Sequence, residues 1–174
     1  MTINPHDIKK ARDGDKEAFG ALYEVVSRDL YKVALYTLGN PQDAEDAVSD
    51  TFVEAFKGLK NLRDENSFVP WIFKILSIRC KRKMSGYVKE RGNIDIDDYI
   101  AGDPASAAVG DNSLRAELKD VLWKLKPDER EIIILSVTEG FTMRETAEIM
   151  GLPQGTVSSK LHRTLKKLRI MLTD

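Results

Sequence analysis

The sequence predicts an all-α protein with two small helical domains joined by a flexible linker, the second domain being a helix-turn-helix. Apolar residues recur at spacings of three and four in most segments that lie between prolines and glycines, which is typical of amphipathic helices. No stretch of any length alternates with period two. Residues 86–112 lack a sustained period, so we expect domains at 1–85 and 113–174 with the linker between them.

Length and composition indicate a soluble globular chain. Its 174 residues suffice for one full domain or two small ones. The net charge is −1, so only the distribution of charge, and not its sum, can argue for nucleic acid. There is no signal peptide and no apolar run of about 18 residues. The single Cys80 excludes an internal disulfide and is typical of a reducing cytoplasm, so we expect a cytoplasmic protein.

The first domain begins with a short predicted helix at 5–13, which ends at Gly14. A longer helix follows at 17–38, where eight apolar side chains keep the helical spacing. Gly39 suits the left-handed residue that often follows the end of a helix.

The chain then restarts a helix at Asn40, which we expect to be the N-cap before Pro41. Asp43 is placed to complete a capping box with Asn40. Another helix is predicted to start near Pro70 and to run through WIFKILSIRCKRK to Met84. The stretch beyond it is rich in glycine and small residues and carries six acids against two bases, which favours a flexible linker that keeps away from DNA.

Helical periodicity returns in the second domain, with helices predicted at 114–125, 127–140, 142–150 and 153–172. The third of these opens with a capping box formed by Thr142 and Glu145, and Gly151 ends it. A short capped helix, a glycine turn and a basic helix together predict a DNA-reading helix-turn-helix. Its core is expected from one set of small and apolar residues: Ala147, Ile149, Leu152, Val157, Leu161 and Leu165.

The last helix carries the polar residues that would face a DNA groove. Residues 154–174 hold five bases and one acid. The predicted contacts are Thr156, Ser158, Ser159, Lys160, His162 and Arg163. A helical hairpin with a solvated basic face is the alternative, and a helix-turn-helix alone leaves repressor, activator and transposase open.

A second basic segment lies at 74–91, where seven bases stand against one acid. Phe68, Trp71 and Phe73 come just before it. Aromatic rings beside cations suit single-stranded or distorted nucleic acid, because the rings stack on bases while the cations hold phosphate. A core position for Trp71 is the competing interpretation.

The helix that starts at Asn40 is acidic on one side. A helical wheel at about 100° per residue places one set of residues together as core: Ala44, Val48, Thr51, Phe52, Ala55 and Leu59. A different side carries the acids Asp43, Asp46, Asp50 and Glu54. A metal site, a solvated face and a surface for a partner other than DNA are all compatible with this stripe. The absence of an ExxH pairing, a phosphate loop or a nucleophile motif disfavours an enzyme, and we expect no metal and no cofactor.

Two segments resemble the extracytoplasmic-function (ECF) sigma factors, small bacterial members of the sigma-70 family. They are GDKEAFGALYEVVSRDLYKVALYTLGNPQDAEDAVSDTFVEAFKGLKNL…FVPWIFKI and LKPDEREIIILSVTEGFTMRETAEIMGLPQGTVSSKLHRTLKKLR. Their order and spacing match the family over nearly the whole chain outside the linker. The resemblance implies two domains that bind core RNA polymerase and recognise a promoter, rather than catalysis.

The resemblance implies that the second domain reads the −35 element with the six residues of the last helix given above. Many family members have arginine where Ser158 stands, so the −35 preference is expected to differ.

The first domain is implied to read and open the −10 element. The residues carried over are Asn66, Ser67, Phe68, Trp71, Lys74, Ile78, Arg79 and Arg82. Family members commonly have asparagine in place of Ile78 and often aspartate in place of Arg82, which changes the expected base preference. Flipping a base costs a few kcal/mol that such a pocket must recover.

The resemblance also implies partners. The acidic stripe is expected to dock on the clamp coiled coil of the largest polymerase subunit, and the second domain on the flap of the second-largest subunit. An anti-sigma factor is a further expected partner. A stand-alone helix-turn-helix regulator is the alternative, although it would leave residues 1–83 without a role and normally dimerises on a two-fold operator.

Overall fold

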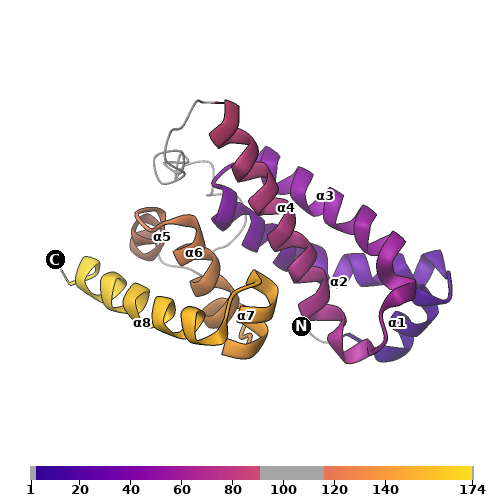
Figure 1. The fold of residues 1–174 in the computed structure, drawn as a ribbon. Coiled ribbons are helices and arrows are strands. Elements are labelled where there is room, and N and C mark those ends of the chain that lie inside the picture. Colours follow the sequence, from indigo (N-terminus) through magenta and orange to yellow (C-terminus); the bar gives the residue numbers. More distant parts are fainter. Residues whose placement is uncertain (1–2, 91–115, 174) are drawn as a thin grey trace.

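The computed structural model describes residues 3–90 and 116–173, and every regular element in these ranges is a helix (Figure 1). The first half holds α1 (Pro5–Arg12), α2 (Lys16–Leu38), α3 (Pro41–Gly58) and α4 (Phe68–Glu90), with short 3-10 turns at Leu59–Asn61 and Glu65–Ser67. The second half holds α5 (Ala116–Trp123), α6 (Pro127–Ile133), a π-helical turn (Ile134–Thr138), α7 (Met143–Met150) and α8 (Gln154–Met171). The predicted all-α class is confirmed.

Side-chain caps fix where the helices of the first half begin. The Asp15 carboxylate accepts hydrogen bonds from the backbone N–H groups of Glu17 and Ala18 at 2.9 and 3.1 Å. The Asn40 side chain accepts from the N–H of Asp43 at 3.1 Å, which confirms the predicted N-cap of α3. Gly39 has a φ of 71° and ends α2 as expected.

The buried side of α3 is the one that the sequence predicts. Ala44, Val48, Thr51, Phe52, Ala55 and Leu59 are all buried. They pack α3 against α2 and α4, which also contact each other. The acidic side of α3 therefore lies outside this core and faces either α4 or solvent.

Helix α4 is longer than the sequence predicts. It begins at Phe68, before Pro70, and a proline in the first turn removes no helical hydrogen bond. It then continues past Gly86 to Glu90, so the end predicted at Met84 was wrong. Residues 91–112 of the predicted linker lie outside the described residues.

The segment from 127 to 140 is not one continuous α-helix. After α6 the backbone widens into a π turn, in which the N–H of Glu139 donates to the carbonyl of Ile134 at 2.9 Å. Phe141 follows this turn and packs against Phe73 of α4 in the first half.

The two helical halves pack on each other, with α2 against α6 and α4 against α7 (Figure 1). Tyr36 stacks on Trp123 with ring centroids 5.6 Å apart. Phe73 meets Phe141 edge to face at 5.0 Å. These aromatic contacts join the two apolar cores into one.

Arg130 is buried at this boundary. Its guanidinium lies 4.6 Å from the centre of the Trp123 ring and donates to the carbonyls of Leu125 at 3.2 Å and Thr37 at 3.5 Å. The desolvation lowers the pKa of Arg130 to about 10. Thr37 lies in the last turn of α2, so the Arg130 side chain links the two halves through backbone oxygens.

Its neighbour Glu131 is also buried, beside Ser77 and Lys81 of α4. Burial raises the pKa of Glu131, while Ser77 and Lys81 act in the opposite direction. The Lys81 ammonium donates to the carbonyl of Met150 at the end of α7. Two buried charged residues therefore sit between the halves.

Candidate nucleic-acid interface

The helix-turn-helix forms as the sequence predicts. Thr142 and Glu145 exchange hydrogen bonds at the start of α7, from the Thr142 N–H at 2.8 Å and from the Glu145 N–H at 3.2 Å. Gly151 adopts a φ of 65°, which a side chain with a Cβ would strain. The N–H of Leu152 then reaches the carbonyl of Ala147 at 3.0 Å and fixes the turn into α8.

The core between α7 and α8 differs from the prediction at one position. Ala147, Ile149 and Val157 are buried, and Leu152 and Leu161 are half-buried. Leu165 is 44% exposed, so its assignment to this core was wrong. It lines instead an apolar groove of about 550 Å³ formed by α5, α6, the π turn and α8.

Five of the six predicted −35 residues are exposed on α8: Thr156, Ser158, Ser159, His162 and Arg163. The Ser159 hydroxyl donates to the carbonyl of Thr156 at 3.1 Å, and the Arg163 Nε donates to the carbonyl of Ser159 at 3.3 Å. These bonds stay within the helix and leave the remaining guanidinium nitrogens of Arg163 available to a ligand.

The sixth residue, Lys160, lies differently. It is half-buried and forms an ion pair with Asp128 in the first turn of α6. Lys167, seven residues or about two turns further along α8, likewise pairs with Glu129 at 3.0 Å. The structure therefore directs Lys160 toward α6 rather than outward.

Two cations were missed on the exposed side of α8. Lys166 and Arg169 are exposed and follow His162 by four and seven residues, which places them on its face. That spacing was available in the sequence. Together with Arg163 they make the −35 face more basic than predicted.

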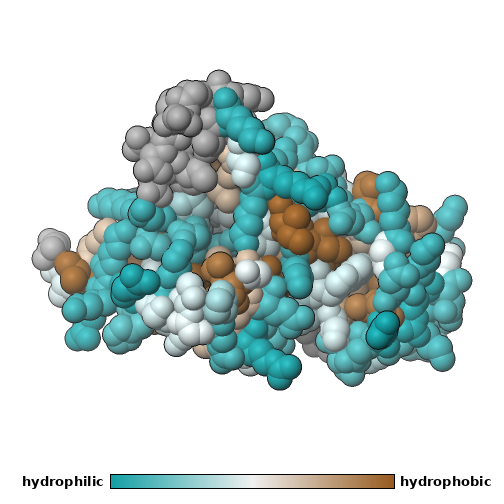
Figure 2. All heavy atoms as spheres, in the orientation of Figure 1, coloured by the Kyte–Doolittle hydropathy of each residue, from teal (hydrophilic) through white to brown (hydrophobic). Residues whose placement is uncertain are grey.

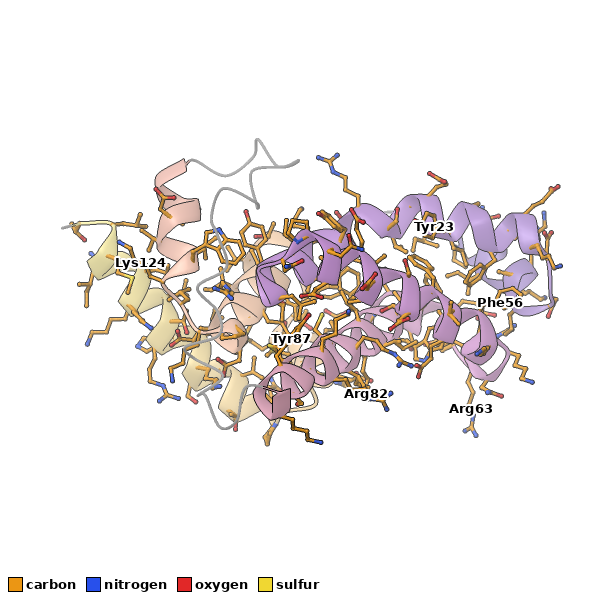
Figure 3. The ribbon with its side chains drawn as sticks, turned by 90° about the horizontal axis from the view of Figure 1, so that it is seen from above. Tyr23, Phe56, Arg63, Arg82, Tyr87 and Lys124 are labelled. Atoms are coloured by element: carbon orange, nitrogen blue, oxygen red, sulfur yellow. The ribbon has the colours of Figure 1, made fainter. Side chains whose placement is uncertain are left out.

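On α4, Lys74, Ile78 and Arg82 are exposed and spaced one turn apart, so they form one stripe. Figure 3 shows the Arg82 side chain projecting away from the helices. Arg63, in the loop before α4, is also exposed and points outward in the same view, although the prediction did not include it. A basic stripe with an apolar centre is thus available to DNA.

The aromatic residues before this stripe are largely structural. Phe68 is fully buried, so its predicted contact with a base does not fit this conformation. Trp71 is half-buried against Phe68, with ring centroids 6.1 Å apart. A Cβ added at Gly58 would lie 3.2 Å from the Trp71 ring, so Gly58 lets the indole pack closely on the end of α3.

Asn66 and Ser67 are exposed in the turn that leads into α4. Asp64 organises this turn by accepting hydrogen bonds from the Asn66 backbone at 3.0 Å, the Asn66 side-chain amide at 3.1 Å and the Ser67 hydroxyl at 3.3 Å. The two predicted −10 residues are therefore held in fixed positions next to the basic stripe.

The acidic stripe of α3 is largely used inside the molecule. Lys83 of α4 pairs with Asp43 at 3.6 Å and with Asp46 at 3.2 Å. Arg79, another predicted −10 residue, forms an ion pair with Glu54. The structure thus pairs one predicted −10 residue, Arg79, with one predicted polymerase residue, Glu54, and uses two more acids of the stripe in ion pairs with Lys83, across the α3–α4 contact.

Asp50 alone among the four predicted acids is exposed and outside any ion pair between described residues. Large apolar side chains are also exposed on α3 and on its neighbour α2: Val53 and Phe56 on α3, and Tyr23 on α2, are 56%, 52% and 43% exposed. Phe19 links the set through an edge contact with Phe56 at 5.1 Å. In Figure 3, Tyr23 and Arg82 lie on opposite sides of the first half, and Phe56 lies between them toward the end far from α8.

Among the described residues no group of three or more His, Cys, Asp or Glu side chains could hold a metal ion. No helix in the described ranges is long and apolar enough to cross a bilayer. On the face shown in Figure 2, apolar side chains form small separate areas within a mostly hydrophilic surface.

Known proteins match both halves. The sigma-70 region 2 model matches residues 22–87, and the sigma-70 region 4 model matches residues 115–168. The ECF RNA polymerase sigma-E factor of Haemophilus influenzae is 30% identical over 90% of this chain and 88% of that protein. The solved structure of CnrH in complex with the cytosolic domain of CnrY aligns with a TM-score of 0.70 and 26% identity, covering 97% of this chain and 96% of that one.

A further solved structure shares the fold. The sigma factor RpoE of Bartonella quintana, solved with the anti-sigma factor NepR, aligns with a TM-score of 0.65 at 24% identity. The alignment covers 89% of this chain and 96% of that one.

Proposed function

Because the chain belongs to the ECF sigma factors, we propose that its two exposed basic faces contact the two elements of a promoter while α3 binds core RNA polymerase. The chain is a regulatory initiation factor that directs promoter-specific transcription. The assignment of these three surfaces rests on one observation, which is that the basic and the acidic surfaces lie on different helices. The α4 stripe and the α8 face are basic, whereas the exposed part of α3 is acidic and apolar.

The −35 face is the exposed side of α8, which the major groove of B-DNA can admit. Ser158, Ser159 and His162 offer hydrogen-bonding groups to base edges. Arg163 can take guanine or phosphate, and Lys166 and Arg169 continue along the backbone.

The −10 face is the α4 stripe with the turn before it. Lys74, Arg82 and Arg63 would hold backbone phosphate, and the rigid Asn66–Ser67 turn would meet an unstacked base. Ile78 offers that base apolar packing without a hydrogen bond, so the −10 preference is expected to rest on shape at this position.

The polymerase face is the part of α3 around Asp50, together with Val53, Phe56 and Tyr23. Exposed aromatic residues ringed by charge are typical of protein interfaces. We assign this face to the basic clamp coiled coil of the largest subunit. The apolar groove that includes Leu165 is the proposed seat for the flap of the second-largest subunit.

The proposed domain limits are 1–85 and 113–174, with a linker at 86–112. The two family-model segments lie mainly within these limits, with residues 86 and 87 crossing the first. An anti-sigma factor is a further proposed partner, because such a complex is known for the Bartonella relative. The proposed location is the cytoplasm, where polymerase and chromosome are found.

Run-off transcription over a genomic promoter library tests the function. Core polymerase with the chain is expected to produce discrete transcripts that core polymerase alone does not produce. Absence of both transcripts and polymerase binding would overturn the proposal. Tight sequence-specific binding of duplex DNA by the chain without polymerase would favour the stand-alone regulator instead.

A further inference from the structure

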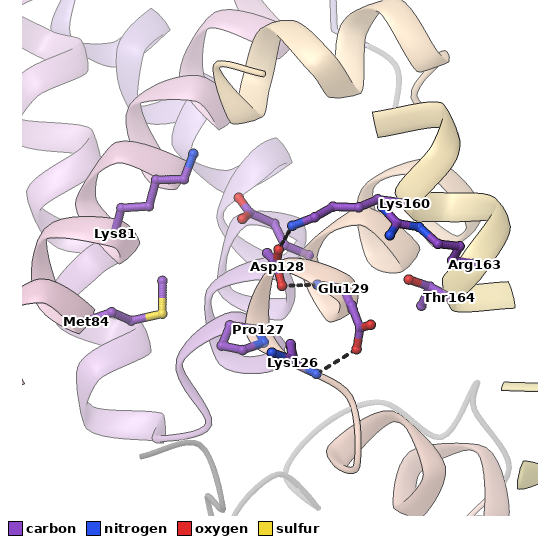
Figure 4. A pocket seen from close by; sticks show the side chains of 10 residues that line it. Lys81, Met84, Lys126, Pro127, Asp128, Glu129, Lys160, Arg163 and Thr164 are labelled. Carbon is purple, nitrogen blue, oxygen red and sulfur yellow. Dashed lines mark hydrogen bonds and ion pairs between the residues drawn. The ribbon is translucent and has the colours of Figure 1, made fainter. Parts of the chain in front are cut away.

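The first turn of α6 carries two carboxylates that each bind a cation of α8. Asp128 pairs with Lys160 and Glu129 pairs with Lys167. Figure 4 shows the Lys160 side chain reaching from α8 across to Asp128. Both acids are thus directed at the helix that presents the −35 face.

Asp128 is held in place for this contact. Its second carboxylate oxygen accepts a hydrogen bond from the N–H of Glu129 at 2.9 Å. The start of α6 also carries unpaired N–H groups that favour a negative charge in the first turn. The Asp128 carboxylate is therefore a fixed charge rather than a freely moving surface acid.

Lys160 lies at the edge of the −35 face. At about 100° per residue it stands roughly 40° from Thr156 and roughly 60° from Arg163 around the α8 axis. Its side chain is 31% exposed and that of Asp128 is 38% exposed, so the pair sits at the surface and not in the core. A lysine stem released from Asp128 at this edge is long enough to turn toward a phosphate beside Thr156.

We infer that Asp128 is a positioning residue that withholds Lys160 from promoter phosphate and so lowers the effective charge of the −35 face. This inference rests on the proposed −35 role of α8. Arg163, Lys166 and Arg169 then supply the phosphate contacts of α8, and Lys160 supplies none while Asp128 holds it. Asp128 also places a negative charge next to the DNA, which disfavours close approach on that side.

The test measures how holoenzyme affinity depends on salt. Holoenzyme is assembled with the full chain, and its binding to a duplex promoter recovered by run-off selection is titrated between 50 and 200 mM KCl. Asp128→Asn is expected to bind more tightly than wild type at 50 mM and to steepen the slope of log K against log salt by about 0.9, the value for one extra phosphate contact. Its advantage over wild type should then shrink by about 3.5-fold across that range.

Three companion variants make the result specific. Lys160→Gln alone should leave the slope unchanged, and Asp128→Asn/Lys160→Gln should lose the whole gain. Asp120→Asn removes one exposed acid of the same domain, outside any ion pair between described residues, and should not change the slope. Asp128→Ser, which also suits the start of a helix, replaces Asp128→Asn if the latter fails to fold.

Weaker binding in Asp128→Asn would show that the pair supports the DNA-binding fold of α8 instead, and would overturn the inference. An unchanged slope would mean that Lys160 gains no phosphate contact, and would overturn it too. A gain that persists in the double variant would overturn it as well. If wild-type holoenzyme neither binds nor transcribes any promoter, the proposed function fails, which is a separate and recognisable outcome.

Discussion

The hydroxyl of Tyr87 donates a hydrogen bond to the carboxylate of Asp43 at 2.7 Å, and this contact ties the last turns of α4 to the first turn of α3. Asp43 is 8% exposed, so it belongs to the fold rather than to a surface that another protein touches. The sequence groups Asp43 with three other acids, and only the tertiary structure separates them.

Replacing Asp43 is therefore expected to affect stability. Asp43→Ala removes a buried carboxylate that accepts from the Tyr87 hydroxyl and pairs with Lys83, and it should lower the free energy of unfolding by about 1–3 kcal/mol. Asp46→Ala removes an exposed partner of Lys83 and of the Gln42 amide and should change the free energy of unfolding by less than about 1 kcal/mol. Urea unfolding followed by circular dichroism compares the two variants, and equal losses would contradict the structural role of Asp43.

Asp50 is expected to act in polymerase binding. Asp50→Lys, and the double reversal Asp46→Lys/Asp50→Lys, should slow association with core polymerase roughly three- to tenfold at low salt while the unfolding midpoint of the single variant stays unchanged. Surface plasmon resonance measures the rates. Asp13→Lys, an exposed acid after α1, is the matched control. An unaffected association rate in Asp50→Lys would return this acid to plain solvation.

Glu131 is expected to make stability fall as pH rises. Burial raises the pKa of Glu131 in the folded protein. At a pH between the unfolded and the folded pKa, the folded state therefore holds a proton that the unfolded state has already released. Its contribution is largest below about pH 4.3, the ordinary pKa of glutamate, and is lost as pH rises toward the raised value.

Glu131→Gln removes this titration and should be more stable than wild type at pH 7 by roughly 1–3 kcal/mol, with the difference shrinking toward pH 4. Urea titrations at a series of pH values follow the difference. A difference that is constant with pH would mean that Glu131 keeps its charge throughout, stabilised by Lys81.

Arg163 is expected to contact DNA in the holoenzyme. Arg163→Gln should reduce the slope of log K against log salt by about 0.9 if the contact is to phosphate. If the contact is instead to a guanine edge, the variant should lose about 1–3 kcal/mol of discrimination at one base pair. Filter binding to a promoter and to its single-base variants separates the two cases, and Lys10→Gln on α1 is the control. A variant that changes neither quantity would remove Arg163 from the −35 face.

Sequence periodicity was sufficient for most of the fold, because amphipathic helices and their caps are local features. The N-cap at Asn40, the stop at Gly39 and the box of Thr142 with Glu145 all follow from neighbouring residues. The extension of α4 past Gly86 was not predictable in this way. Glycine costs only about 1 kcal/mol inside a helix, and the contact of Tyr87 with Asp43 offsets that cost.

The candidate sites were less predictable, because a helical wheel shows which residues share a side but not what that side meets. Arg79 and Glu54 were assigned to two different functional surfaces, and the structure pairs them with each other. Lys160 was assigned to DNA, and it faces Asp128, a residue 32 positions earlier. Phe68 was assigned to a base and is completely buried.

The close packing of the two halves limits how far the molecule can reach. A compact body of this length has a radius of gyration of about 16 Å and is roughly 40 Å across. Promoter elements centred about 25 base pairs apart are separated by about 85 Å along B-DNA. We therefore expect the Tyr36–Trp123 and Phe73–Phe141 contacts to part before α4 and α8 can occupy both elements at once. Spin labels at Lys10→Cys and Asp120→Cys should move apart when holoenzyme binds a promoter, and an unchanged distance would require strongly bent DNA instead.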